Sequence, residues 1–169
     1  MKLAQLSRLP AIAALLFTTL AFDQATKMVA RRVLANTPAS EYLGGMLRIQ
    51  FAENTGAFLS LGSAMDEHSR FLMFTAGVGV FLVGATYVLL RKSQMDRRTT
   101  AGLTLLVAGG LGNLIDRLIY GYVTDFLNVG IGQLRTGIFN VADMAIVLGV
   151  ILLFFADSGK KSAPKSTVA

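Results

Sequence analysis

The chain of 169 residues contains no cysteine and a single histidine, His68. Thiol nucleophiles, disulfide bonds and the usual zinc sites are therefore excluded or nearly so, as is a Ser-His-Asp triad. Charged residues are also scarce, at 15% of the chain, whereas 53% of it is hydrophobic. A soluble domain of this length carries more charge, so the composition predicts a membrane protein in which carboxylates are the only strong acids or bases.

Basic residues outnumber acidic ones, and the formal net charge is +6. They lie between apolar runs and not along one soluble face, as a nucleic-acid surface would require. Contact with anionic lipid headgroups explains them more simply. We therefore expect a phospholipid membrane, and no nucleic acid, among the partners of this chain.

Four apolar runs predict four transmembrane helices. The clearest run, residues 71–90, holds no charge and lies between Arg70 and Arg91. The first run, residues 10–22, also holds no charge, and the span around it from Arg8 to Lys27 is about 28 Å long as a helix. The other two are residues 99–119 and about 140–155. The third run contains small residues that would let neighbouring helices approach closely, namely Gly102, Gly109, Gly110 and Gly112. An alternative for the first run is a secretory signal peptide that is cleaved near Ala21.

The longest polar stretch, residues 36–69, separates the first two runs. Within it, the alternating residues 46–51 (MLRIQF) predict a strand, and Asn54-Thr55-Gly56 predicts a turn. Before it, Lys27–Ala35 predicts either a short amphipathic helix on the membrane surface or a continuation of the first helix. His68 is expected in a solvated loop.

The predicted fold is an all-α integral membrane protein with four transmembrane helices and a small extracytoplasmic cap that contains some β structure. Residues 1–158 form one transmembrane domain that includes an extracytoplasmic loop at about 28–69, and residues 159–169 form a basic, disordered cytoplasmic tail. Segments 2–8, 91–98 and 160–165 hold nine basic residues, which favours the cytoplasm for that end. The basic residues at 27, 31 and 32 oppose this orientation.

Polar residues converge on the other end of the predicted helices. Ionisable side chains in hydrocarbon cost a few kcal/mol each and are candidates for function by default. With four antiparallel spans, the same membrane face receives Asp23, Asn54, Asn113, Asp116, Asp125 and Asp143. We expect these groups to meet in one pocket.

Two carboxylates that share a proton can hydrolyse a peptide bond without a metal, a thiol or histidine. One takes the proton of the attacking water while the other donates to the substrate carbonyl, and their repulsion keeps them from ionising together. Four aspartates are available for the two positions: Asp23, Asp116, Asp125 and Asp143. No cofactor and no metal is expected.

These residues also have structural alternatives. Asn140 and Asp143 have the spacing of a helix N-cap and its third residue. Asp116 could form an ion pair that anchors its helix, Arg117 could meet a lipid phosphate, and Asp23 could end the first helix. Asp125 is surrounded by apolar residues, so a purely structural role is weakest there.

Five sequence blocks match a known family. They are Asp23-Gln24 with Lys27, Asn54-x-Gly56-Ala57, Gly112-Asn113 with Asp116-Arg117, Val123-x-Asp125-Phe126, and Phe139-Asn140-x-Ala142-Asp143. With these blocks the chain resembles the bacterial lipoprotein signal peptidases, or type II signal peptidases, which are aspartic intramembrane proteases. The resemblance implies that Asp125 and Asp143 are the catalytic dyad. It implies supporting or substrate-binding roles for Asp23, Lys27, Asn54, Gly56, Asn113, Asp116, Arg117 and Asn140.

The resemblance also implies a reaction and a place. The family removes the signal peptide from diacylglyceryl-modified prolipoproteins by cleaving before the lipidated cysteine, at the outer face of the bacterial inner membrane. We expect a multi-pass monomer with its active site near that face. Phe58-Leu59 stands where the family usually has Ala-Phe, and Leu127–Ile138 lacks the aromatic residues common in the family.

Two other functions remain open from the sequence. Membrane carboxylates also serve small proton-coupled transporters or channels, but transporter sites usually lie near the midplane between internal repeats. Here the polar groups gather at one end. A non-catalytic assembly subunit would leave the pairing of Asp125 with Asp143 unexplained.

Overall fold

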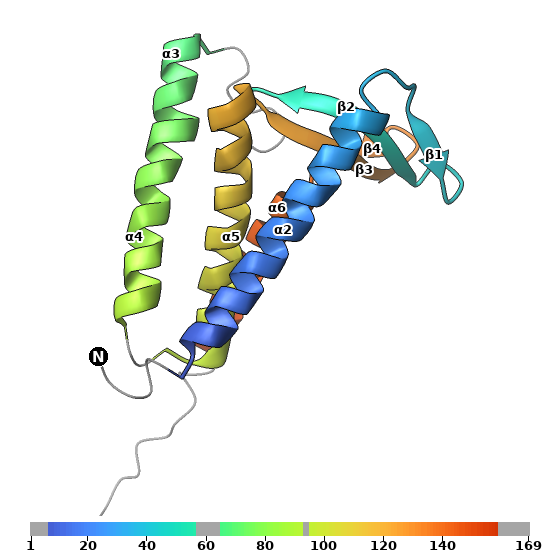
Figure 1. Ribbon diagram of the computed structural model, residues 1–169. Coiled ribbons are helices and arrows are strands. Elements are labelled where there is room, and N and C mark those ends of the chain that lie inside the picture. Colours follow the sequence, from blue (N-terminus) through green and yellow to red (C-terminus); the bar gives the residue numbers. More distant parts are fainter. Residues whose placement is uncertain (1–6, 57–64, 93–94, 159–169) are drawn as a thin grey trace, which may run out of the picture.

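The computed structural model describes residues 7–56, 65–92 and 95–158. Phe58-Leu59 and the tail 159–169 lie outside the described residues. The elements in order are α2 (Leu9–Val33), β1 (Ser40–Tyr42), β2 (Leu47–Asn54), α3 (Glu67–Arg70), the π-helical segment η2 (Phe71–Gly77), α4 (Val78–Arg91), α5 (Arg97–Tyr120), β3 (Val123–Ile131), β4 (Leu134–Arg135) and α6 (Val141–Ser158). Figure 1 shows the helices as a bundle, with the sheet at one end, beside the last turns of α2.

Three helices in the described chain are long and apolar enough to cross a membrane: α2, the continuous helix Glu67–Arg91 formed by α3, η2 and α4, and α5. The apolar part of α6, Val141–Ala156, is about 24 Å long, somewhat less than a hydrocarbon core of about 30 Å. The expectation of a mostly helical membrane protein with a small sheet is confirmed. The fourth crossing stays a prediction.

Helix α2 is longer than the first apolar run. It continues through Lys27 to Val33, so a separate surface helix at Lys27–Ala35 is wrong and the continuation is right. Pro10 lies in the first turn, where its missing N–H leaves no hydrogen bond unmade. Asp23, Lys27 and Ala30 are buried on one face at helical spacing. This face carries contacts of α2 with α5 and α6, through Lys27 to Asn113 and through Asp23 to Ala142.

Helices α5 and α6 pack closely at positions where glycine leaves room for the backbone of the other helix. A Cβ atom at Gly102 would lie 2.9 Å from the carbonyl oxygen of Gly149, and one at Gly109 would collide with the carbonyl oxygen of Ala142. The backbone of α6 occupies the space that a side chain would need, so these glycines permit the close packing expected from the sequence.

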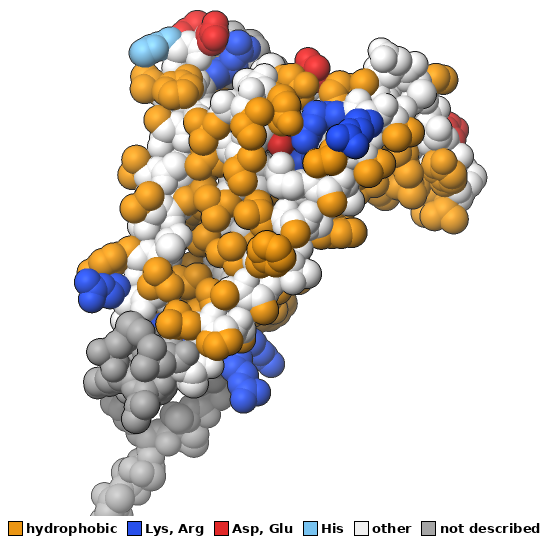
Figure 2. Space-filling model, viewed as in Figure 1, with side chains coloured by type: hydrophobic (Ala, Val, Ile, Leu, Met, Phe, Trp, Pro, Cys, Tyr) orange, Lys and Arg blue, Asp and Glu red, His pale blue; other side chains and the backbone are white. Residues whose placement is uncertain are grey.

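The outer faces of the helices expose large apolar side chains, among them Phe17, Val80 and Phe154. Figure 2 shows hydrophobic side chains spread over the helices and basic ones mainly toward the two ends. Exposed apolar surface of this extent requires a partner, and hydrocarbon is the partner that fits a band between two charged ends.

The four strands form one antiparallel sheet in the order β1-β2-β3-β4. The strand expected at 46–51 is confirmed as β2, which extends to Asn54, and it pairs with β3 so that Ala52 lies opposite Asp125. The sequence pattern does not predict β3, because Val123 to Phe126 are all buried and the usual alternation is absent. His68 is exposed, as expected, but it lies in the helical turn α3 and not in a loop.

Candidate active site

Two asparagine side chains connect Asp125 with Asp143. Asn140 donates from Nδ2 to Asp125 Oδ1 at 2.6 Å and lies within 3.2 Å of Asn113 Oδ1. Asn113 donates from its own Nδ2 to Asp143 Oδ1 at 2.9 Å. The two carboxylates therefore belong to one hydrogen-bonded cluster, although Asp125 comes from β3 and Asp143 from α6.

Asp125 is held from two sides and is only 2% exposed. Asn54, at the end of β2, donates from Nδ2 to Asp125 Oδ2 at 2.9 Å. The backbone N–H of Gly56 donates to Asn54 Oδ1 at 3.1 Å, in the turn predicted there. This bond fixes the orientation of the Asn54 amide. Both oxygens of Asp125 consequently accept hydrogen bonds from amide NH2 groups.

Asp143 and Asn140 form the capping pair that the sequence offered as an alternative. The N–H of Asp143 donates to Asn140 Oδ1 at 3.0 Å, and the N–H of Asn140 donates to Asp143 Oδ2 at 3.2 Å. Free N–H groups at the start of α6 are thereby satisfied. The same Asp143 faces Asn113, so its capping role and its place in the cluster are compatible.

Lys27 is completely buried beneath this cluster. Its Nζ lies 2.9 Å from Asp23 Oδ2 and 3.6 Å from Asp116 Oδ2. It also donates to Asn113 Oδ1 at 2.8 Å. A buried ammonium is tolerated only with such compensation, and a single amide links it to Asp143.

Asp23 does not end the first helix, which continues for more than two turns beyond it. Its Oδ1 accepts the backbone N–H of Ala142 at 2.8 Å. A carboxylate from α2 thus satisfies a free N–H in the first turn of α6, where negative charge is also favoured by the helix dipole. Through this hydrogen bond Asp23 helps to hold the first turn of α6, which carries Asp143.

Asp116 forms the anchoring ion pair that was its structural alternative. Its Oδ1 lies 3.4 Å from Arg31 Nη1, and its Oδ2 accepts the N–H of Thr124 at 2.9 Å. Arg31 also donates to Thr124 Oγ1 at 2.8 Å. Sequence reasoning missed Arg31 and Thr124, yet Asp23, Lys27 and Arg31 recur every four residues on one helix face, which could have revealed Arg31.

Arg117 faces a cavity and not a lipid surface. Its Nη2 donates to the carbonyl oxygen of Gly56 at 2.7 Å, and its Nε is buried without a hydrogen-bond partner in the described chain. With Asn54, Asn113 and Asp143 it lines a cavity of about 340 Å³ whose other walls are apolar side chains of η2, α4, α6 and β3 and the backbone of Gly110. All ten predicted site residues lie in this cluster or contact it.

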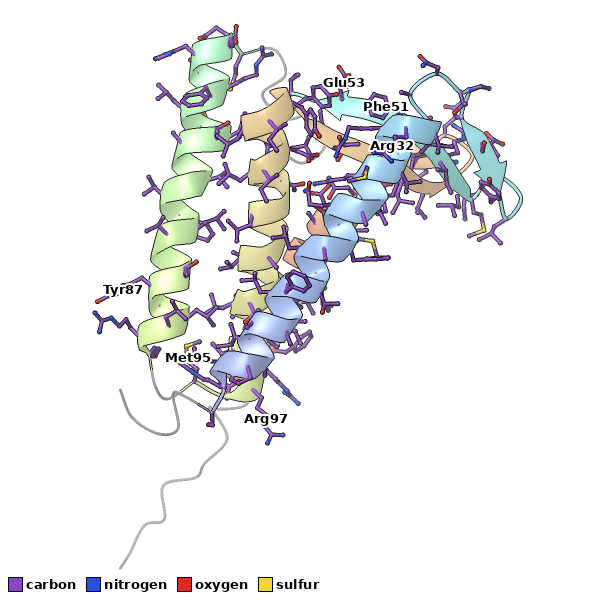
Figure 3. All side chains as sticks on the ribbon, in the orientation of Figure 1. Arg32, Phe51, Glu53, Tyr87, Met95 and Arg97 are labelled. Atoms are coloured by element: carbon purple, nitrogen blue, oxygen red, sulfur yellow. The ribbon has the colours of Figure 1, made fainter. Side chains whose placement is uncertain are left out.

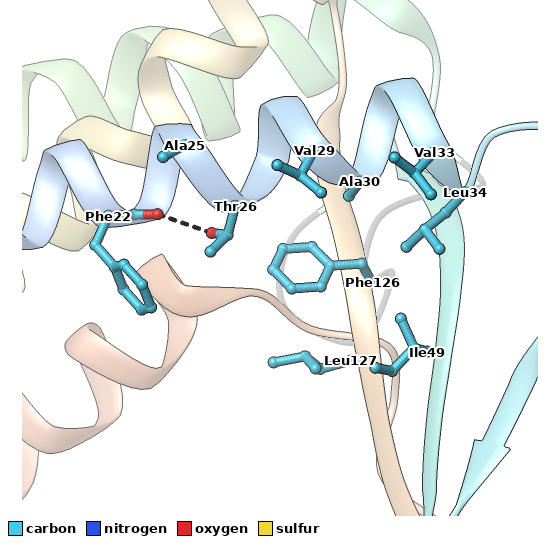
Figure 4. Close-up of a pocket in the computed structure, with 10 residues that line it drawn as sticks. All are labelled: Phe22, Ala25, Thr26, Val29, Ala30, Val33, Leu34, Ile49, Phe126 and Leu127. Carbon is cyan, nitrogen blue, oxygen red and sulfur yellow. Dashed lines mark hydrogen bonds between the residues drawn. The ribbon is translucent and has the colours of Figure 1, made fainter.

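Two further grooves are apolar. One of about 350 Å³ is lined by Asp143 together with Phe139 and the outer face of α6. The other, of about 340 Å³, lies between α2 and the sheet (Figure 4) and contains no charged side chain. Its one hydroxyl, on Thr26, donates to the carbonyl oxygen of Phe22 at 2.9 Å. This last groove contains none of the predicted site residues.

Burial raises the pKa of Asp125 to about 6. The hydrogen bond from Asn54 opposes this shift, whereas the negative charge of Asp143 adds to it. A carboxyl group with such a pKa can hold or release a proton near neutral pH. Within the described residues, no three His, Asp or Glu side chains gather in a way that could hold a metal ion.

Fold and cluster together define a class: a helical membrane protein with two linked carboxylates at one end of its bundle. A sequence profile of signal peptidase II matches residues 15–157. The lipoprotein signal peptidases of Burkholderia ambifaria and Burkholderia vietnamiensis are each 34% identical to this chain over 134 residues, which is 79% of this chain and 79% of each relative. The chain belongs to the signal peptidase II family.

Solved structures agree with this assignment. The chain superposes on a bacterial membrane enzyme, determined by the in meso method at 2.3 Å resolution, with a TM-score of 0.82 and 27% identity. The match covers 95% of this chain and 95% of that enzyme. A second one, determined at 1.9 Å, covers 92% of this chain and 96% of its own, with a TM-score of 0.76 and 25% identity. The expected family is confirmed, and the transporter hypothesis receives no support from these similarities.

Proposed function

We propose that this chain is an aspartic endopeptidase that removes the signal peptide from diacylglyceryl-modified prolipoproteins, cleaving before the lipidated cysteine. One observation carries the proposal: Asp125 and Asp143 are joined through Asn113 and Asn140 beside a cavity that opens among the helices. The family and the names of the relatives support the processing of prolipoproteins.

The chemistry follows from two carboxyl groups that share one proton. The ionised group takes a proton from a water molecule, whose oxygen attacks the carbonyl carbon of the scissile bond, while the protonated group hydrogen-bonds the carbonyl oxygen. The tetrahedral intermediate then collapses. The C–N bond breaks as the nitrogen receives a proton from the dyad, which leaves a new carboxyl terminus, a new amino terminus and the pair ready for another turnover.

The surroundings of Asp143 suit the two parts of such a substrate. The cavity that Arg117 and Asn54 line offers a donor to a peptide backbone, because Arg117 Nε is buried and has no partner in the described chain. The apolar groove along α6 offers a surface for hydrocarbon. Because Asp143 lines both, a peptide bond beside a lipidated residue can be held at the carboxylates.

The placement in the membrane is part of the proposal. We place the sheet and the dyad at the extracytoplasmic face of the bacterial inner membrane, because Arg91, Lys92, Arg97 and Arg98 lie at the opposite end of the bundle. The helices then form four crossings within a single domain of residues 1–158, with the tail 159–169 in the cytoplasm, and the enzyme acts as a monomer.

Cleavage of a lipidated prolipoprotein by the purified protein in detergent, followed on a gel, tests the proposal. Asp125→Asn and Asp143→Asn should each abolish cleavage per folded molecule, whereas Asp66→Asn, which changes an exposed N-cap of α3, should cleave like the wild type. The signal must be corrected for folded protein, because an amide at position 125 places an NH2 group against a donor from Asn54 or Asn140. Turnover at the wild-type rate by either dyad variant contradicts the assignment.

A further inference from the structure

A separate cavity of about 640 Å³ lies at the end of the bundle away from the sheet. It is formed where α2 and α5 begin, and it contains none of the residues assigned to cleavage. Figure 3 shows Met95 and Arg97 at this end, near the first turn of α2. With the orientation proposed above, the cavity faces the cytoplasmic edge of the membrane.

Arg8 gives this cavity an unusual feature. Its Nη2 donates to the carbonyl oxygens of Leu89, at 3.0 Å, and of Lys92. Its Nε and Nη1 are buried and have no hydrogen-bond partner in the described chain. Buried donors on a charged group are costly to leave unpaired, so Arg8 retains a capacity to bind an acceptor.

The remaining lining divides into a polar and an apolar part. Arg97 adds a second guanidinium group, and Ala11, Ile12 and Leu15 form an apolar wall on α2. The one carboxylate close in sequence, Asp96, is engaged at the start of α5, where it accepts the N–H of Thr99 at 2.9 Å and its hydroxyl at 2.7 Å. Within the described residues, neither Arg8 nor Arg97 forms an ion pair with a carboxylate.

We propose that this cavity binds an anionic glycerophospholipid, with its phosphate at Arg8 and Arg97 and an acyl chain along the apolar wall of α2. Guanidinium groups pair well with phosphate oxygens, and basic pockets between membrane helices suit such headgroups. A free phosphate would satisfy only the arginines, and a diacylglycerol only the apolar wall. A phospholipid matches both halves of the lining.

Native mass spectrometry of the detergent-purified protein measures this binding directly. The probes are phosphatidylglycerol, diacylglycerol with the same acyl chains, and inorganic phosphate. Arg97→Gln should weaken phosphatidylglycerol binding about fivefold, the loss expected for one basic contact. Arg32→Gln serves as the matched control, because Arg32 is exposed at the far end of α2. Arg8→Gln is a second test if it folds, since Arg8 also joins α2 to the end of α4.

The outcomes separate the possible ligands. Preferential binding of phosphatidylglycerol that falls in Arg97→Gln and not in Arg32→Gln supports the site. Equal binding of diacylglycerol, or wild-type binding by Arg97→Gln, overturns it, because the arginines would then contribute nothing. Inorganic phosphate that binds as tightly as the lipid also overturns it. Prolipoprotein cleavage by Arg97→Gln in detergent should equal the wild-type rate, so this test is independent of the proposed peptidase activity.

Discussion

Lys27→Met removes the buried ammonium group beneath the carboxylate cluster and keeps a side chain of similar length. In the folded protein Lys27 is fully buried and contacts Asp23 Oδ2 at 2.9 Å, Asp116 Oδ2 at 3.6 Å and Asn113 Oδ1 at 2.8 Å. Arg31 lies 3.4 Å from Asp116 and would still compensate it. Asp23 would lose the cationic group that pairs with it in the described chain.

The loss of stability in Lys27→Met should be large. Removal of one partner from a buried ion pair typically costs about 3–5 kcal/mol, because the other charge is left uncompensated. In a protein of this size each kcal/mol changes Tm by about 2–4 °C, so we expect a fall of about 6–20 °C. Lys92→Met, which changes an exposed lysine, should change the free energy of unfolding by less than about 0.5 kcal/mol.

Thermal unfolding in detergent, with a double-mutant cycle, checks the reasoning. Lys27→Met/Asp23→Asn removes both charges and should recover part of the lost stability, with a coupling of about 1–3 kcal/mol. The bond from the Ala142 N–H can be retained by the amide oxygen of an asparagine at position 23. If the two losses simply add, the ion pair between Lys27 and Asp23 is not what stabilises the site.

Stability, packing and inhibitor response supply three more predictions. Burial raises the pKa of Asp125 from 3.8 to about 6, so the folded state binds this proton more tightly than the unfolded chain does. The stability that this proton contributes is present below about pH 4 and is lost as the pH rises through about 6. Tm should therefore fall over that interval, and should fall less in Asp125→Asn. Gly109→Ala drives a Cβ into the Ala142 carbonyl oxygen and should lower Tm by several degrees, whereas Gly84→Ala has nothing within 4 Å and should not; equal Tm values for the two variants would contradict the packing argument. Cleavage should be insensitive to chelators and thiol reagents, because the chain has no cysteine and its one histidine, His68, is exposed; activity lost to a chelator and restored by zinc would overturn the two-carboxylate mechanism.

The helices could be predicted because an uncharged apolar run long enough to cross a bilayer is typical of a transmembrane helix. Their ends were less predictable: Lys27 and Arg31 resemble residues of a membrane surface, but they are buried or half-buried against Asp116 and extend α2 into the site. Strand β3 carries no alternation because both of its faces near Asp125 are covered. Sequence patterns record which residues are polar, and they do not record which neighbours compensate them.

The candidate active site could likewise be predicted only in part. Topology alone predicted that the aspartates share one end of the bundle, and the family resemblance singled out Asp125 and Asp143. The amide links through Asn113 and Asn140 could not be predicted, because they depend on the register of β2 with β3 and on the rotation of α5 against α6. The cap that Asp23 provides for α6 joins residues 119 positions apart, a separation over which no local spacing rule applies.

That last contact has a consequence for biosynthesis. A chain emerging from the ribosome delivers Asp23 and Lys27 to the membrane long before Ala142 and Asp143 have been made. Until α6 inserts, Asp23 has its ion pair with Lys27 but lacks the N–H of Ala142, and the proposed dyad has only one member. We therefore expect a nascent chain truncated before α6 to be inert as a hydrolase, so that cleavage begins only after α6 has been made and inserted.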